Sequence, residues 1–262
     1  MIVRNLQLIL MVLFLPTSPV NAKTPVDIEL VLAVDTSLSM DIDELKLQRE
    51  GYAQALEHRA VTSALVSGKL GRVAIMIFEW GGAGRERVLI EWTLVESHED
   101  AAAIAAKLRM APIQGMRGTS ISGAMTSADI WIAANDFEGT RKVIDISGDG
   151  PNNRGRAVNE VRDEIAAKGI EINGLPFMFK QPDGLYSIPD LDIYYEDCVI
   201  AGDMAFVIPI YEIERLIVSI RQKLVLEVSG QMPPKTARLR NASNPDCLIG
   251  ERLQRQRQWN IP

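Results

Sequence analysis

Strand-length apolar runs alternate with helical patterns along most of the chain, and this alternation restricts the fold more than any other feature of the sequence. The runs predicted as strands are 28–34, 73–78, 88–94, 143–146, 170–175 and 205–208. Helical patterns lie between or after them, at about 41–56, 101–109, 121–134, 157–167 and 211–226. Strands that alternate with helices form a mostly parallel sheet covered on both faces. The sequence therefore predicts an α/β fold with a doubly wound, mostly parallel six-stranded sheet and helices on both faces.

The connection between the second and third runs is of a different kind. The segment Gly81–Arg87, GGAGRER, is too short to contain a crossover helix. Parallel neighbours need a connection of about a dozen residues or more, whereas antiparallel neighbours need only a tight turn. We therefore predict a hairpin here, which makes the third strand an antiparallel edge strand.

The composition is that of one ordinary globular domain with small additions. The 262 residues are 47% hydrophobic and 24% charged, with a formal net charge of −6, which excludes disordered and fibrous classes. A mildly acidic chain is a poor general binder of nucleic acid or anionic lipid. We predict a domain at 23–229 with an insertion at 176–204, which is either a surface loop or a cap over a site, and a basic tail at 230–262.

Residues 1–22 have the features of a secretory signal peptide. Arg4 precedes an apolar run at Leu6–Leu15, Pro16 follows the run, and Val20-Asn21-Ala22 supplies a cleavage site. An uncleaved anchor is the alternative, but the run has about half of the roughly 20 residues that a spanning helix needs. We expect cleavage after Ala22 and a periplasmic or secreted protein that has no membrane span.

The chain has two cysteines, Cys198 and Cys247. In an exported protein an even pair predicts a disulfide, and this one would tether the tail to the insertion. Two buried free thiols are the alternative. A zinc site is not expected, because two cysteines without paired CxxC spacing and two histidines do not readily supply four ligands.

Carboxylates and hydroxyls follow the predicted strands. Asp35, Ser37 and Ser39 come directly after the first strand, Thr119 begins a helical pattern, and Asp149 follows the strand that ends in KVIDIS. In open parallel sheets, ligands bind beyond the carboxyl ends of the strands. Hard oxygen ligands of this kind suit Mg²⁺ or Mn²⁺. Taken singly, each residue is equally well explained as a helix cap or a turn residue.

Taken together, the five residues resemble the metal-ion-dependent adhesion site of the von Willebrand factor type A domain. The likeness covers about residues 26–225 and implies a von Willebrand A, Rossmann-like fold. It implies that Ser37, Ser39 and Thr119 contact a divalent cation, Mg²⁺ first and Mn²⁺ or Ca²⁺ as alternatives. Asp35 and Asp149 would hold the cation through water. It also implies a coordination position for the Asp or Glu carboxylate of a protein partner, which an underneutralised cation attracts.

Three local features accompany this likeness. Gly148 precedes the second aspartate, where the family commonly has threonine. The segment YYEDCVIAG, together with export, is similar to a bacterial group of unknown function within the family. Asp41, Asp43 and Glu44 begin the helix after the first strand, and we expect them only to interact favourably with the helix dipole.

The predicted function is that of a binding module rather than an enzyme, and two alternatives remain open. One is a metal-dependent, phosphatase-like hydrolase with Asp35 as the nucleophile. Such enzymes have a DxD pattern after the first strand, whereas here Asp35 is followed two residues later by Ser37. A serine hydrolase is disfavoured because no GxSxG segment occurs. The other alternative is a structural module whose metal site is idle.

Overall fold

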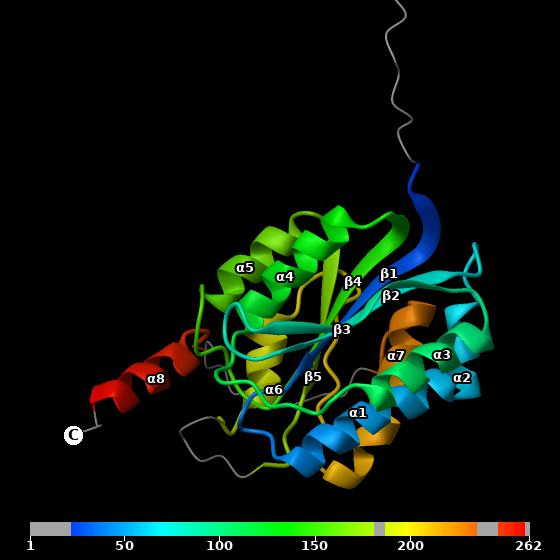
Figure 1. Ribbon diagram of the computed structural model, residues 1–262. Coiled ribbons are helices and arrows are strands. Elements are labelled where there is room, and N and C mark those ends of the chain that lie inside the picture. The colour runs from blue at the N-terminus through cyan, green and yellow to red at the C-terminus, as the bar shows by residue number, and fades with distance from the viewer. Residues whose placement is uncertain (1–21, 181–186, 235–245, 260–262) are drawn as a thin grey trace, which may run out of the picture.

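The computed structural model describes residues 22–180, 187–234 and 246–259, and a five-stranded sheet lies at its centre (Figure 1). The strand order is β3-β2-β1-β4-β5. The edge strand β3 runs antiparallel to β2, and the other neighbours are parallel, so the predicted hairpin is confirmed. The strands are β1 (Thr24–Asp35), β2 (Val73–Trp80), β3 (Glu86–Val95), β4 (Phe137–Gly148) and β5 (Ile170–Pro176).

Helices cover both faces of the sheet, as predicted (Figure 1). One face is covered by α1 (Ile42–Glu57), α2 (Arg59–Leu65), α3 (His98–Met110) and α7 (Leu216–Ser229). The other is covered by α4 (Ile121–Ala134), α5 (Val158–Ala166) and α6 (Leu191–Tyr194). A short 3₁₀ turn (Ile213–Arg215) precedes α7, and α8 (Ile249–Trp259) lies in the tail.

The central position of β1 explains why Leu30–Val34 is an unbroken apolar run. Leu30 and Leu32 pack into the core beneath α1 and α7, whereas Val31 and Ala33 pack into the core beneath α4 and α5. Successive side chains of a strand point to opposite faces, so a strand covered on both sides needs apolar residues at every position. The winding direction reverses between β1 and β4, and the carboxyl ends of these two strands form the switch point at which such sheets bind ligands.

The predicted sixth strand, Ala205–Ile208, is wrong. The segment runs beside β5 but contacts it only through isolated bridges, one of them at Gly174. A regular ladder does not form because the N–H of Phe206 donates to the side chain of Asn173 at 3.0 Å. Ile208 N and Ile210 N still donate to carbonyls of β5, at Gly174 and Pro176. Pro176 has no N–H to donate back to the segment, which leaves a gap between these bonds. The sheet therefore ends at β5.

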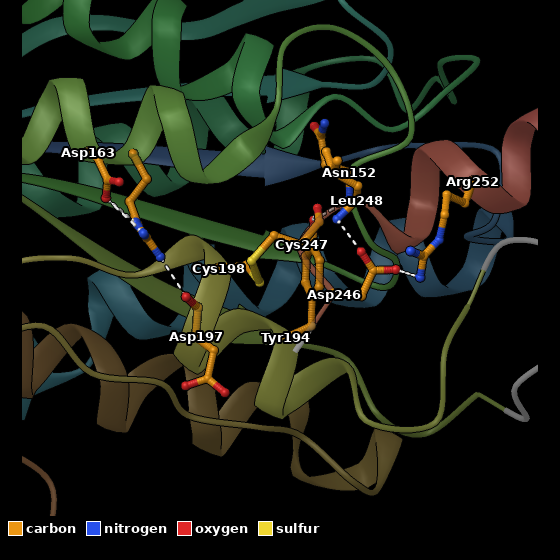
Figure 2. The surroundings of a disulfide bond; sticks show 10 residues. Asn152, Asp163, Tyr194, Asp197, Cys198, Asp246, Cys247, Leu248 and Arg252 are labelled. Carbon is orange, nitrogen blue, oxygen red and sulfur yellow. Dashed lines mark hydrogen bonds and ion pairs between the residues drawn. A yellow bond between two sulfur atoms is a disulfide. The ribbon is translucent and has the colours of Figure 1, made fainter. Parts of the chain in front are cut away.

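The insertion has helical structure of its own and is joined to the tail. A π-helical turn, Tyr195–Val199, follows α6, and its Cys198 forms a disulfide with Cys247 (Figure 2). The disulfide prediction is confirmed. Beyond the bond, Asn152 donates from Nδ2 to Glu251 Oε1 of α8 at 2.6 Å. The start of α8 is thus fixed to the domain, while the rest of the helix extends away from it (Figure 1).

A buried ionic cluster lies beneath α7, and its five members are Tyr52, Asp145, Asn173, Lys223 and Glu227. Lys223 Nζ lies 2.5 Å from Asp145 Oδ1 and also pairs with Glu227. Asn173 donates to Glu227 Oε1 at 3.1 Å. Burial raises the pKa of Glu227 to about 7, with the Asp145 carboxylate adding to the effect and Lys223 opposing it. The cluster holds two carboxylates against one ammonium group, so a proton on Glu227 makes it neutral.

Nearly all of the predicted signal peptide, residues 1–21, lies outside the described residues. Across 22–180, 187–234 and 246–259, no helix combines the length and the apolar character that crossing a bilayer requires.

Candidate metal centre

Two aspartates meet at the switch point of the sheet. Asp35 is the last residue of β1, and Asp149 follows the last residue of β4. These strands are parallel neighbours, so their carboxyl ends share one edge. Both side chains are buried. The backbone N–H of Asp149 donates to Asp35 Oδ2 at 3.4 Å, which joins the end of β4 to the carboxylate of β1.

The loop after β1 brings two serine hydroxyls to this pair. Asp35 Oδ1 accepts from the backbone N–H of Ser37 at 2.7 Å, a local turn that aspartate favours. The hydroxyl oxygens of Ser37 and Ser39 lie 2.8 Å apart, and Ser39 donates to Asp149 Oδ1 at 2.6 Å. Four of the five predicted residues are therefore members of one hydrogen-bonded group.

Thr119, the fifth predicted residue, reaches the same edge by its backbone. Its N–H donates to Asn153 Oδ1 at 3.1 Å, and its carbonyl accepts from the Asn153 N–H at 2.9 Å. The preceding loop is fixed to the serine loop, because Met116 N donates to the carbonyl of Thr36 at 2.7 Å. The Thr119 side chain is buried. Within the described part of the chain, no hydrogen bond joins its hydroxyl to the other four residues.

Burial makes the aspartate pair electrostatically unfavourable. Loss of solvent raises the pKa of Asp35, the Asp149 carboxylate raises it further, and the hydrogen bonds from Ser37 and Asp149 only partly offset this, so that the pKa reaches about 8. Two buried carboxylates next to each other cannot both stay charged without a nearby positive charge. A proton on Asp35 or a positive charge beside the pair would relieve this repulsion.

Lys180 supplies one positive charge, and sequence reasoning missed it. Its ammonium group lies 3.0 Å from Asp149 Oδ2 and 2.7 Å from Glu44 Oε2, and it donates to the backbone carbonyl of Ser39. Burial alone would lower the pKa of Lys180, but the attraction of Asp149 and Glu44 raises it on balance. Lys180 lies at the start of the insertion, where no periodic pattern marks its partners.

The acidic start of α1 does more than interact with the helix dipole. Asp41 caps the helix by accepting from the N–H groups of Asp43 and Glu44, and the Glu44 side chain accepts from the N–H of Asp41 in return. The ion pair with Lys180 gives Glu44 a second role, which corrects the expectation for this residue. Glu44 thus keeps the ammonium group over the serine loop.

The donor atoms fit a hard divalent cation. The hydroxyls of Ser37 and Ser39 and the carboxylate of Asp149 converge within hydrogen-bonding distance of one another. Asp149 Oδ2 accepts no hydrogen bond within the described residues and contacts only the Lys180 ammonium. The same residues hold no group of three or more His, Cys, Asp and Glu side chains arranged for a metal. Any cation here would therefore depend on hydroxyl ligands, as Mg²⁺ and Mn²⁺ accept.

Comparison with sequence families gives one match. Residues 25–232 match a family described as "Protein of unknown function (DUF1194)". No curated protein sequence matches the chain.

Comparison with solved structures finds von Willebrand A domains. The chain is similar to the vWF domain of the type V pili tip protein Mfa5 from Porphyromonas gingivalis (TM-score 0.55, 11% identity, 81% of this chain and 98% of that chain). It is similar to the pilus adhesin SpaC from Lactobacillus rhamnosus GG (TM-score 0.57, 13% identity, 78% of this chain and 30% of that chain). It is also similar to proximal thread matrix protein 1 from the mussel byssus, in a structure with a zinc-occupied MIDAS motif (TM-score 0.53, 12% identity, 79% of this chain and 49% of that chain).

Identities this low show the fold alone. The sheet order, the antiparallel edge strand and the helices on both faces are those of a von Willebrand A fold, as predicted. The chain spans less than half the length of SpaC and of the byssus protein.

Proposed function

The chain belongs to the DUF1194 family of proteins of unknown function, and from this premise and its von Willebrand A fold we propose that it is an exported protein-binding module. The module holds a divalent cation, Mg²⁺ first and Mn²⁺ or Ca²⁺ as alternatives, and the cation engages an Asp or Glu of a protein partner. The residues proposed to hold the cation are Asp35, Ser37, Ser39, Thr119 and Asp149.

One observation carries the proposal. The hydroxyls of Ser37 and Ser39 and the carboxylate of Asp149 form a connected group beside the buried Asp35. Burial raises the pKa of Asp35 and repulsion by Asp149 raises it further, and a divalent cation beside the two carboxylates would offset both effects. With two hydroxyl ligands and carboxylates reached through water, the cation would keep much of its charge, and a carboxylate from a partner would be attracted to it.

The surface around the group suits a protein partner. Leu38, between the two serines, is 59% exposed, and Ile42, at the start of α1, is 50% exposed. Arg117 and Arg154 are exposed on neighbouring loops. An acidic side chain flanked by apolar residues would therefore find both charge and apolar contact here.

The comparisons support a binding role. Two of the similar structures are described as a pilus adhesin and a pilus tip protein, and a third as having a zinc-occupied MIDAS motif. The disulfide fits an exported protein, since such bonds persist in oxidising compartments. We accordingly retain the signal peptide at 1–22, the domain at 23–229 and the disulfide-tethered tail at 230–262 as parts of the proposal.

The test compares cation affinity and partner capture in matched variants. The double change Asp35→Ala with Asp149→Ala should abolish Mg²⁺ binding in titration calorimetry and abolish Mg²⁺-dependent retention of a partner that EDTA releases. Asp43→Ala is the control, because Asp43 is an exposed acid on α1 that pairs with Lys46 rather than with the site. Unchanged binding and capture in the double variant would refute the proposal.

The same preparations separate the two alternatives. A phosphatase-like hydrolase would cleave an aryl phosphate with Mg²⁺ and lose that activity in Asp35→Asn. A structural module with an idle site would capture its partner equally well in Mg²⁺ and in EDTA.

A further inference from the structure

The tyrosine pair of the YYEDC segment is not used by the proposed function, yet one of its members reaches the cation site. Tyr195 begins the π-helical turn of the insertion, and its side chain is fully buried. Its hydroxyl has no hydrogen-bond partner among the described residues. A buried hydroxyl without a partner costs stability, so an unpartnered one beside a candidate site requires a reason.

Two glycines allow the Tyr195 ring to pass along the sheet toward the site. A Cβ atom at Gly174 of β5 would lie 2.6 Å from the ring atom Cδ1, and a Cβ at Gly148 of β4 would lie 2.8 Å from the hydroxyl oxygen. Side chains at either position would collide with the tyrosine. Glycine at position 148 therefore leaves the space that the tyrosine hydroxyl occupies.

The Tyr195 hydroxyl lies beside the Asp35 carboxylate. The same position at Gly148 that lies 2.8 Å from Tyr195 Oη lies 3.0 Å from Asp35 Oδ2. The two atoms flank one glycine and are within the reach of a single bridging water. Burial raises the pKa of Tyr195 well above its ordinary value, and Asp35 adds to this effect, so the hydroxyl keeps its proton and can donate.

We propose that Tyr195 is a positioning residue of the cation site, which donates a water-mediated hydrogen bond to Asp35 and fixes the orientation of that carboxylate. This inference rests on the proposed function. Groups that orient the ligands of a metal, or the residues that hold its water, commonly change metal affinity by about 10- to 100-fold when they are removed. Cys198, in the same turn, attaches the tyrosine's segment to the tail and limits its movement.

The test is Tyr195→Phe, which removes the hydroxyl and keeps the ring. We expect Mg²⁺ affinity in titration calorimetry to fall by at least about tenfold. The melting temperature without metal should change little, because the buried ring and its packing are kept and no direct hydrogen bond to another described residue is lost. A Mn²⁺ spectrum by electron paramagnetic resonance should change as the carboxylate loses its fixed orientation.

Tyr194→Phe is the matched control. Tyr194 is the adjacent tyrosine, and its hydroxyl accepts from Asn152 N at 3.2 Å instead of facing Asp35. This variant should bind Mg²⁺ as the wild type does. Wild-type affinity in Tyr195→Phe would overturn the inference and leave the proposed function standing. Absence of cation binding by the wild type itself would overturn both.

Discussion

Replacement of Lys180 by glutamine should make the protein bind Mg²⁺ more tightly. The ammonium group pairs with Asp149 at 3.0 Å and donates to the carbonyl of Ser39, so it contacts two of the residues proposed to hold the cation. A divalent cation at the same carboxylate would be repelled by this charge, and the Lys180 contact with Asp149 would have to break. Lys180→Gln removes the competing charge and keeps a side chain of similar length.

The magnitude follows from the contact that is lost. A hydrogen bond to a charged group contributes about 1.5–3 kcal/mol. The Lys180 side chain is 20% exposed, so solvent weakens the contact only partly. Because 1.4 kcal/mol corresponds to a factor of ten, the variant should bind Mg²⁺ about ten- to hundredfold more tightly. Without metal it should melt at a lower temperature, because Asp149 and Glu44 lose their counter-charge.

Titration calorimetry and thermal melting, each with Mg²⁺ and with EDTA, measure both effects. Lys46→Gln is the control, since Lys46 pairs with Asp43 on the exposed side of α1 and should leave Mg²⁺ affinity unchanged. Equal or weaker affinity in Lys180→Gln would refute the view that the lysine competes with the cation.

Two further predictions concern stability. Glu227 has a raised pKa in the folded chain, so between about pH 4.5 and 7 the folded state holds a proton that the unfolded state has released, and stability falls by about 3 kcal/mol as the pH rises through this window. Glu227→Gln should make that part of the curve of urea stability against pH less steep, with the slope due to Asp35 remaining, and an unchanged slope would contradict the assignment. Replacing Cys198 and Cys247 together by alanine removes a cross-link between residues 49 apart and should lower the free energy of unfolding by up to about 4 kcal/mol; an unchanged urea midpoint would show that the bond adds nothing.

The strands and most helices could be predicted because burial on two faces leaves a simple pattern. β1 is apolar at consecutive positions, and α4 has the predicted bounds, Ile121–Ala134. The segment at 205–208 has the same apolar pattern, but the side chain of Asn173 and the missing N–H of Pro176, both in β5, reduce the pairing to isolated bridges. This interruption depends on which residues of the neighbouring strand face the segment, and the apolar pattern of the segment alone does not show its neighbours.

The site was only partly predictable, for a similar reason. Asp35, Ser37 and Ser39 lie within one short loop, and Asp149 ends a core strand, so strand order alone predicts their meeting. Lys180 and the hydroxyl of Tyr195 come from the insertion, which has no periodicity to indicate where its side chains point. Gly148 was the one local hint in the sequence. A glycine stands there in place of the threonine common in the von Willebrand A family, and in the structure the Tyr195 hydroxyl lies against it.

The most direct test of the central claim is calorimetric titration of the mature chain with Mg²⁺ and then Mn²⁺, beside Ser37→Ala. Ser37 is buried, and its hydroxyl lies 2.8 Å from that of Ser39 and 3.5 Å from Asp149 Oδ1, so the change removes a proposed ligand and little volume. We predict saturable binding by the wild type that is lost or strongly weakened in the variant. Equal binding by both proteins, or no binding heat and no shift in melting temperature for the wild type, would contradict it.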